Sequence, residues 1–92
     1  MDIRRKRLKL RAWRRGTREL DLIFGTMVDQ WVEIMSEPQI TQIEALLAEQ
    51  DLLVYDWIIG RTAIPPQHQH EMMDELQNFA RLCANVQQGR GG

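Results

Sequence analysis

The sequence has little of what catalytic and metal-binding sites are usually built from. Its 92 residues include one cysteine, Cys83, and one serine, Ser36. A single cysteine excludes an internal disulfide and a thiol-rich metal site, so we expect Cys83 to pack as a small apolar side chain. Ser36 begins the pattern Ser-Glu-Pro-Gln, which is typical of a helix N-terminus, and no serine is left for a catalytic triad. The glycines are isolated, which excludes a glycine-rich phosphate-binding loop.

Long apolar runs are also missing. No stretch of about 18 apolar residues exists that would predict a membrane-spanning helix. No apolar signal-peptide core follows the basic start, so we expect no membrane insertion. The single cysteine favours a reducing compartment. The 43% hydrophobic and 27% charged composition is typical of a folded chain. At this length, it predicts one small domain with a thin core.

The two histidines, His68 and His70, are separated by one residue. On a helix, residues i and i+2 point about 200° apart, so these two cannot bind one ion together. We expect both to face solvent in the first turn of a helix. The sequence therefore predicts no metal site and no catalytic residue.

The net charge of −1 conceals a strong asymmetry. Residues 1–18 hold nine basic residues against one acidic residue, whereas residues 19–92 hold three basic and twelve acidic residues. Such an asymmetry indicates a partner, whether a nucleic acid, an anionic membrane surface or an acidic protein face. The alternative is that the basic segment folds over its own acidic body.

Helical periodicity dominates the chain, and no segment alternates like a strand. We predict an all-α fold, a small five-helix bundle with short loops, as one domain over residues 1–86. The glycine-rich tail, residues 87–92, is predicted to be disordered. The first helix is expected at residues 3–15. The second follows the cap Thr17 and has an apolar stripe that reaches Met35, and the third begins at Ser36. The fourth runs from the cap Asp51 to Gly60, and the fifth covers residues 66–86.

The tryptophans and one glycine deserve separate predictions. Trp31 and Trp57 lie on apolar stripes and are expected in the core. Trp13 lies among arginines, and its place on the core or on the basic surface stays open. Gly16 is expected to end the first helix in a left-handed conformation, directly before the cap Thr17.

The segment Arg14-Arg15-Gly16-Thr17-Arg18-Glu19-Leu20-Asp21 resembles the RGxxE signature of the SdhE family, which is also called succinate dehydrogenase assembly factor 2. The similarity continues through Tyr55-Asp56-Trp57 and Gly60 and covers residues 4–83. One departure is that Leu53 and Val54 stand where the family often has an acidic residue.

The resemblance implies a small helical assembly factor of the bacterial cytoplasm that is not itself an enzyme. Such factors bind the flavoprotein subunit of succinate dehydrogenase, and in bacteria also that of fumarate reductase, and promote covalent attachment of FAD to the subunit. No cofactor is expected to stay bound, because FAD belongs to the client. The alternative function is a nucleic-acid-binding helical protein that uses the basic arm, although the acidic body would repel a polyanion.

The chemistry of the motif residues predicts a surface that contacts a partner. Arg15 offers a fork for a carboxylate, Gly16 admits a close backbone, and Glu19 accepts hydrogen bonds. Without a partner, Gly16 would be only a cap and Glu19 only a charge in the first turn of a helix. The expected partner-binding residues are Arg11, Arg14, Arg15, Gly16, Arg18 and Glu19.

Overall fold

The computed structural model describes the backbone of residues 2–91 and the side chains of residues 2–83. Five α-helices and one short 3-10 helix make up the described chain, and no strand occurs within it. The predicted all-α, five-helix architecture is therefore confirmed. The elements are α1 (Ile3–Ala12), α2 (Arg18–Trp31), α3 (Glu37–Leu47), α4 (Asp51–Ile58), η1 (Pro66–His68) and α5 (Glu71–Gly91).

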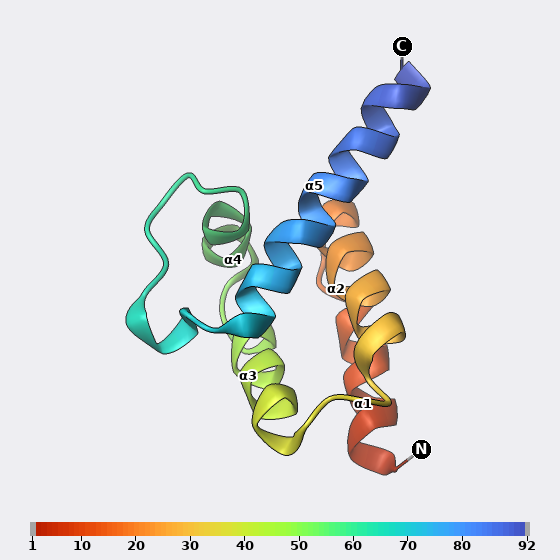
Figure 1. The fold of residues 1–92 in the computed structure, drawn as a ribbon, viewed down its shortest axis with the longest axis vertical. Coiled ribbons are helices and arrows are strands. Elements are labelled where there is room, and N and C mark those ends of the chain that lie inside the picture. The colour runs from red at the N-terminus through yellow and green to blue at the C-terminus, as the bar shows by residue number, and fades with distance from the viewer. Residues whose placement is uncertain (1, 92) are drawn as a thin grey trace.

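Helix α2 lies between α1 and α5 and packs against both (Figure 1). Helix α3 contacts α1 and α5, and the short α4 packs on α5. A long connector carries the chain from α4 through η1 to the start of α5. The RGxxE motif lies at the junction between α1 and α2.

Two of the predicted helix N-caps are confirmed. The Thr17 side chain accepts a hydrogen bond from the Leu20 N–H, and Ser36 forms a reciprocal capping box with Gln39. Gly16 adopts the predicted left-handed conformation, with a φ of +109° that favours glycine because a Cβ would clash there. It does not end the first helix, because α1 ends at Ala12 with Trp13 as its C-cap, so the predicted helix over residues 3–15 is too long and Gly16 lies in the link to α2. The prediction for Asp51 is wrong, since Asp51 is the first residue of α4 and the preceding Gln50 makes no side-chain cap.

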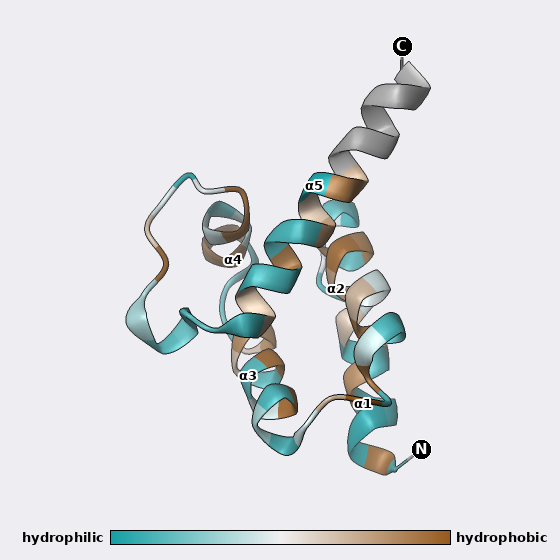
Figure 2. Ribbon diagram, viewed as in Figure 1, coloured by the Kyte–Doolittle hydropathy of each residue, from teal (hydrophilic) through white to brown (hydrophobic). Residues whose placement is uncertain are grey.

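The core forms from the apolar stripes of all five helices, and Figure 2 shows apolar bands alternating with polar ones along the helices. Trp57 is buried as predicted, with 7% of its surface exposed. Trp31 is only half-buried and packs against the edge of the core. Side chains with no exposure at all include Phe24, Met27, Ile43, Leu46, Met72 and Leu76.

The connector before α5 differs from the prediction. Residues 66–68 form η1, and α5 begins only at Glu71. His68 is 3% exposed, stacks on Trp57 with ring centroids 5.2 Å apart, and places Nε2 2.7 Å from Glu49 Oε2. His70 accepts a hydrogen bond from the Met73 N–H, as a helix cap does. The expectation of two solvent-facing histidines is wrong, because the connector folds back onto α4.

The end of the chain leaves one prediction open. Helix α5 continues to Gly91, past the predicted end of the domain at Val86. The side chains of residues 84–92 lie outside the description. The disordered tail at residues 87–92 therefore stays a prediction.

Candidate functional site

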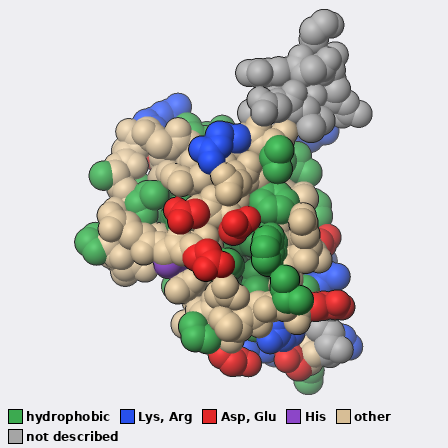
Figure 3. Space-filling view, in the orientation of Figure 1, with side chains coloured by type: hydrophobic (Ala, Val, Ile, Leu, Met, Phe, Trp, Pro, Cys, Tyr) green, Lys and Arg blue, Asp and Glu red, His purple; other side chains and the backbone are tan. Residues whose placement is uncertain are grey.

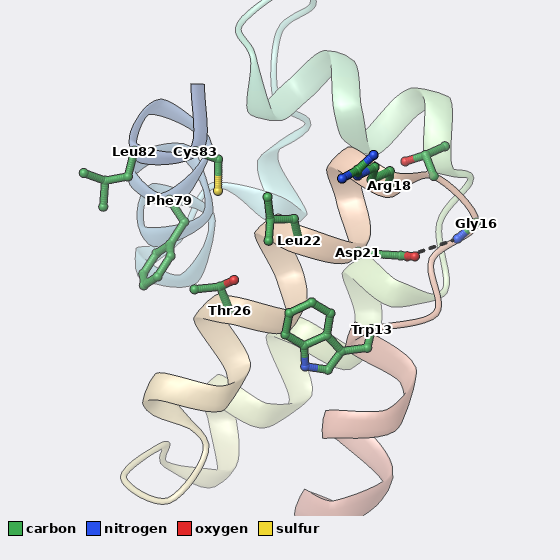
Figure 4. Close-up of a pocket in the computed structure, with 10 residues that line it drawn as sticks. Trp13, Gly16, Arg18, Asp21, Leu22, Thr26, Phe79, Leu82 and Cys83 are labelled. Atoms are coloured by element: carbon green, nitrogen blue, oxygen red, sulfur yellow. Dashed lines mark hydrogen bonds between the residues drawn. The ribbon is translucent and has the colours of Figure 1, made fainter. Parts of the chain in front are cut away.

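The turn between α1 and α2 is held in shape by a carboxylate within the motif. Asp21 Oδ1 accepts hydrogen bonds from the backbone N–H groups of Arg15 and Gly16, the second at 3.3 Å (Figure 4). Because Gly16 takes a left-handed conformation, the chain reverses there and α2 starts one residue after Thr17. The motif is thus a rigid turn on the surface rather than a flexible loop.

Arg15 binds the protein's own body. Its Nη1 donates to the Leu47 carbonyl at 2.5 Å, and its Nη2 donates to the Glu49 carbonyl at 3.1 Å and to Asp51 Oδ1 at 2.6 Å. The side chain is 10% exposed and lies over the Phe24 ring, 5.7 Å from its centroid. Arg15 therefore holds the loop between α3 and α4. The expectation that its guanidinium is free to bind a client carboxylate is wrong, because the guanidinium is bound within the protein and is not open to solvent.

The other predicted contact residues share one property, which is exposure at the α1–α2 junction. Among the described side chains, none forms an ion pair with Arg14, Arg18 or Glu19. The structure thus brings cations, a bare backbone and an anion together at this junction. The exposed members are Arg11, Arg14, Gly16, Arg18 and Glu19.

Several other basic residues of the N-terminal segment are bound to the acidic body. Arg4 donates to Glu44 at 2.7 Å and also pairs with Glu37. The hydrogen bond from Arg4 lowers the pKa of Glu44 below its ordinary value, and the charge of Arg4 adds to this effect. Arg5 donates to the carbonyls of Val32 and Met35. Part of the basic segment therefore folds against the body of the same chain, which is the alternative that the charge pattern raised.

Hollows lie on both sides of the exposed face of α2. On the α4 side, Glu19 and Tyr55 line two small hollows of about 100 and 290 Å³. On the α5 side is a hollow of about 860 Å³, which we call the α2–α5 groove. Its walls are Leu22 and Thr26 of α2, Phe79, Leu82 and Cys83 of α5, and Trp13, with Arg18 at one end (Figure 4).

Trp13, whose position the sequence left open, forms one wall of this groove. Its ring covers Gly25 of α2 so closely that a Cβ on Gly25 would lie 2.1 Å from it. The indole N–H donates to Asp29 at 3.1 Å, and 41% of the side chain stays exposed. Gly25 was missed by the sequence analysis, although a glycine inside a helix costs about 1 kcal/mol and signals close packing.

Cys83 lies on the groove wall and is half-buried. Burial raises the pKa of its thiol, which disfavours the reactive thiolate. No group of three or more metal-ligating side chains forms among residues 2–83. Within the described helices, none is long and apolar enough to cross a membrane.

Fold and site together define a class: a small helical protein whose most distinctive surface is a rigid, charged turn flanked by hollows. Comparison with known proteins gives the family. The sequence profile of the Sdh5 family, described as flavinator of succinate dehydrogenase, matches residues 6–80. The chain belongs to this family, so the resemblance carried by the RGxxE motif is confirmed.

Curated relatives are found in bacteria and in mitochondria. The chain is 33% identical to the FAD assembly factor SdhE of Acetobacter pasteurianus, over 86% of this chain and 72% of the relative. It is 30% identical to the FAD assembly factor SdhE of Legionella pneumophila (strain Lens), over 90% of this chain and 99% of the relative.

A vertebrate relative is longer. The chain is 32% identical to the mitochondrial succinate dehydrogenase assembly factor 2 of Danio rerio, over 88% of this chain but only 52% of that protein. No solved structure matches the chain.

Proposed function

We propose that this protein binds the flavoprotein subunit of succinate dehydrogenase and promotes covalent attachment of FAD to that subunit. The observation that carries the proposal is the rigid turn at residues 15–19, which exposes Gly16, Arg18 and Glu19 next to the exposed Arg14. Family membership and the names of the relatives support the client and the flavin. The turn is preorganised, so little conformational entropy is lost when a partner binds it.

The proposed role is to hold the client, not to catalyse bond formation. The only thiol has a raised pKa, and the buried His68 is engaged by Glu49 and Trp57. These features support a protein whose charged groups recognise a partner, with FAD kept by the client. Fumarate reductase as a second client and the bacterial cytoplasm as the location stay predictions.

The alternative, a nucleic-acid-binding arm, is not favoured. Such an arm needs phosphate-facing cations, but Arg4, Arg5, Lys9 and Arg15 are bound to the protein's own acids and carbonyls. The acidic residues that hold them would face the same polyanion. Fewer free cations would also give weaker, less salt-dependent binding.

The experiment is Glu19→Ala in cells that lack the native copy, with Glu33→Ala as the matched control. Both glutamates are exposed, but Glu33 lies past the end of α2, away from the turn. Covalent flavin on the subunit is measured by in-gel fluorescence. We expect Glu19→Ala to reduce the covalent flavin by about tenfold, which is the effect typical of an important interface residue. The melting temperature should stay unchanged. Normal flavin in cells without the protein would refute the function.

A further inference from the structure

We propose that the α2–α5 groove binds an amphipathic helix of the flavoprotein subunit, with apolar side chains seated in the groove and a carboxylate beside Arg18. This inference rests on the proposed function and adds a second contact surface to the motif turn. It also defines the chemistry of the client segment.

The groove is apolar and open to solvent. Leu82 is 58% exposed and Trp13 is 41% exposed, although both are large apolar side chains, and both line this hollow on the surface of a small protein. In the space-filling view of Figure 3, hydrophobic side chains gather near the middle of the molecule, where α2 and α5 pack together. Contiguous exposed apolar surface of this kind marks binding sites in soluble proteins.

The shape of the groove fits a helix. Its two long walls are helices, with Leu22 and Thr26 four residues apart on α2, and Phe79 and Cys83 four residues apart on α5. Rows of side chains at this spacing form the ridges between which a third helix packs. Amphipathic helices that lay one apolar face into such a groove are a common mode of recognition.

The charges at one end of the groove select an acidic segment. Asp21, the acid nearest this end, is held by the backbone N–H groups of Arg15 and Gly16, and Asp29 is held by Trp13 and Lys9. The guanidinium of Arg18 has no such partner among the described side chains and lies in the first turn of α2, where the helix dipole also favours an anion. A client carboxylate therefore has both a cation and a helix N-terminus to face.

The groove is continuous with the motif surface. Leu22 lines both this groove and the small hollow that contains Glu19, and Thr17 is likewise shared between the two sides of α2. A client that contacts Glu19 across the top of α2 is thus already next to the groove. One binding event would cover both surfaces.

The single cysteine gives a direct test. Cys83 lies in the groove wall and also lines the smaller hollow that contains Glu19, so its alkylation by iodoacetamide, followed by mass spectrometry of this chain, reports whether a partner covers this part of the surface. Full labelling within the complex means that the groove is empty, and the Leu82 variant below tests the groove by itself. With the FAD-free flavoprotein subunit at about ten times its Kd, labelling should slow about tenfold, because only the free chain reacts. The control is Cys83→Ala combined with Ala45→Cys, because Ala45 is exposed on α3 and lines none of the hollows described here. Its labelling should not change.

A substitution tests the same surface by affinity. Leu82→Arg should weaken the complex by about tenfold or more, as expected when an apolar interface anchor is lost. Leu10→Arg is the matched control, because Leu10 on α1 is 59% exposed, against 58% for Leu82, and lies outside the groove. Both variants should melt like the native protein. Arg18→Glu should weaken the complex as well.

The outcomes separate this inference from the proposed function. If Glu19→Ala weakens the complex while Cys83 labels at full rate within it, the groove is empty and the inference fails, but the function stands. Failure of the native protein to bind the subunit would refute the function itself. Protection of Cys83 by free FAD alone, or by raising the concentration of this chain alone, would make the occupant a flavin or a second copy. Either result would overturn the proposed client helix.

Discussion

The basic N-terminal segment divides into two rows of arginines with opposite fates. The first row consists of Arg4, Arg5 and Arg15, which are bound to the protein's own body. The second row is exposed and consists of Arg7, Arg11, Arg14 and Arg18. The charge cluster that looks uniform in the sequence is therefore half structural support and half free surface, and only the free half is available to a partner.

The bound row does specific structural work at helix ends. Arg5 donates to the carbonyls of Val32 and Met35, just past the end of α2, and Arg15 donates to those of Leu47 and Glu49, at the end of α3. The last carbonyls of a helix have no partner within it, and a guanidinium can satisfy two of them at once. These arginines hold α2 and α3 against the N-terminal segment.

The largest effect on stability that we predict from this comparison comes from removing one bound arginine. Arg15→Ala leaves two carbonyls and the Asp51 carboxylate without their donor in a nearly buried place. We expect a loss of about 3 kcal/mol in the free energy of unfolding. For a domain of this size, that lowers the melting temperature by more than about 10 °C, measurable by circular dichroism.

The matched control is Arg14→Ala in the exposed row, which should change stability by less than about 0.5 kcal/mol. Arg15→Lys should recover little, because one ammonium cannot reproduce a planar fork to three acceptors. Equal melting temperatures for Arg14→Ala and Arg15→Ala would show that the two rows do not differ in the way the structure indicates.

A smaller effect is expected at Gly16, which joins the two rows. Its φ of +109° disfavours any side chain by about 1 kcal/mol, and a Cβ there would lie 2.9 Å from Asp51 Oδ2. Gly16→Ala and Gly16→Arg should therefore melt at similar, slightly lowered temperatures. If the client approaches this glycine, Gly16→Arg should bind it far more weakly than Gly16→Ala does. Equal affinities would show that Gly16 serves only to shape the turn between α1 and α2.

The sequence was sufficient for features that depend on local chemistry. Helical periodicity, the caps at Thr17 and Ser36 and the left-handed Gly16 are all determined within a few residues. Within α1, the exposed Arg7 and Arg11 are spaced by four residues and share one helical face, whereas Arg14 and Arg18 lie outside this helix.

Features that depend on distant residues were not predictable in this way. The acceptors of Arg15 lie 32 to 36 residues away, so nothing near the motif indicates that the guanidinium is occupied. His68 is buried by stacking on Trp57 of another helix, which its polar neighbours in the sequence conceal. The α2–α5 groove needs the packing of two helices that are far apart in the chain. These are tertiary effects that override local preference.

The smallest effect we predict concerns Arg4, the other end of the bound row, and it depends on pH. The hydrogen bond from Arg4 lowers the pKa of Glu44, so this pair stabilises the fold at pH values above the ordinary pKa of a glutamate. The stabilisation is lost as the pH falls through the lowered pKa and Glu44 is protonated. Arg4→Gln should therefore melt below the native protein at pH 7, and the difference should close under strongly acidic conditions. Lys6→Gln, an exposed change on the same helix, should show no such pH dependence, and a constant difference for Arg4→Gln from neutral to acid would mean that Arg4 acts by packing rather than by its charge.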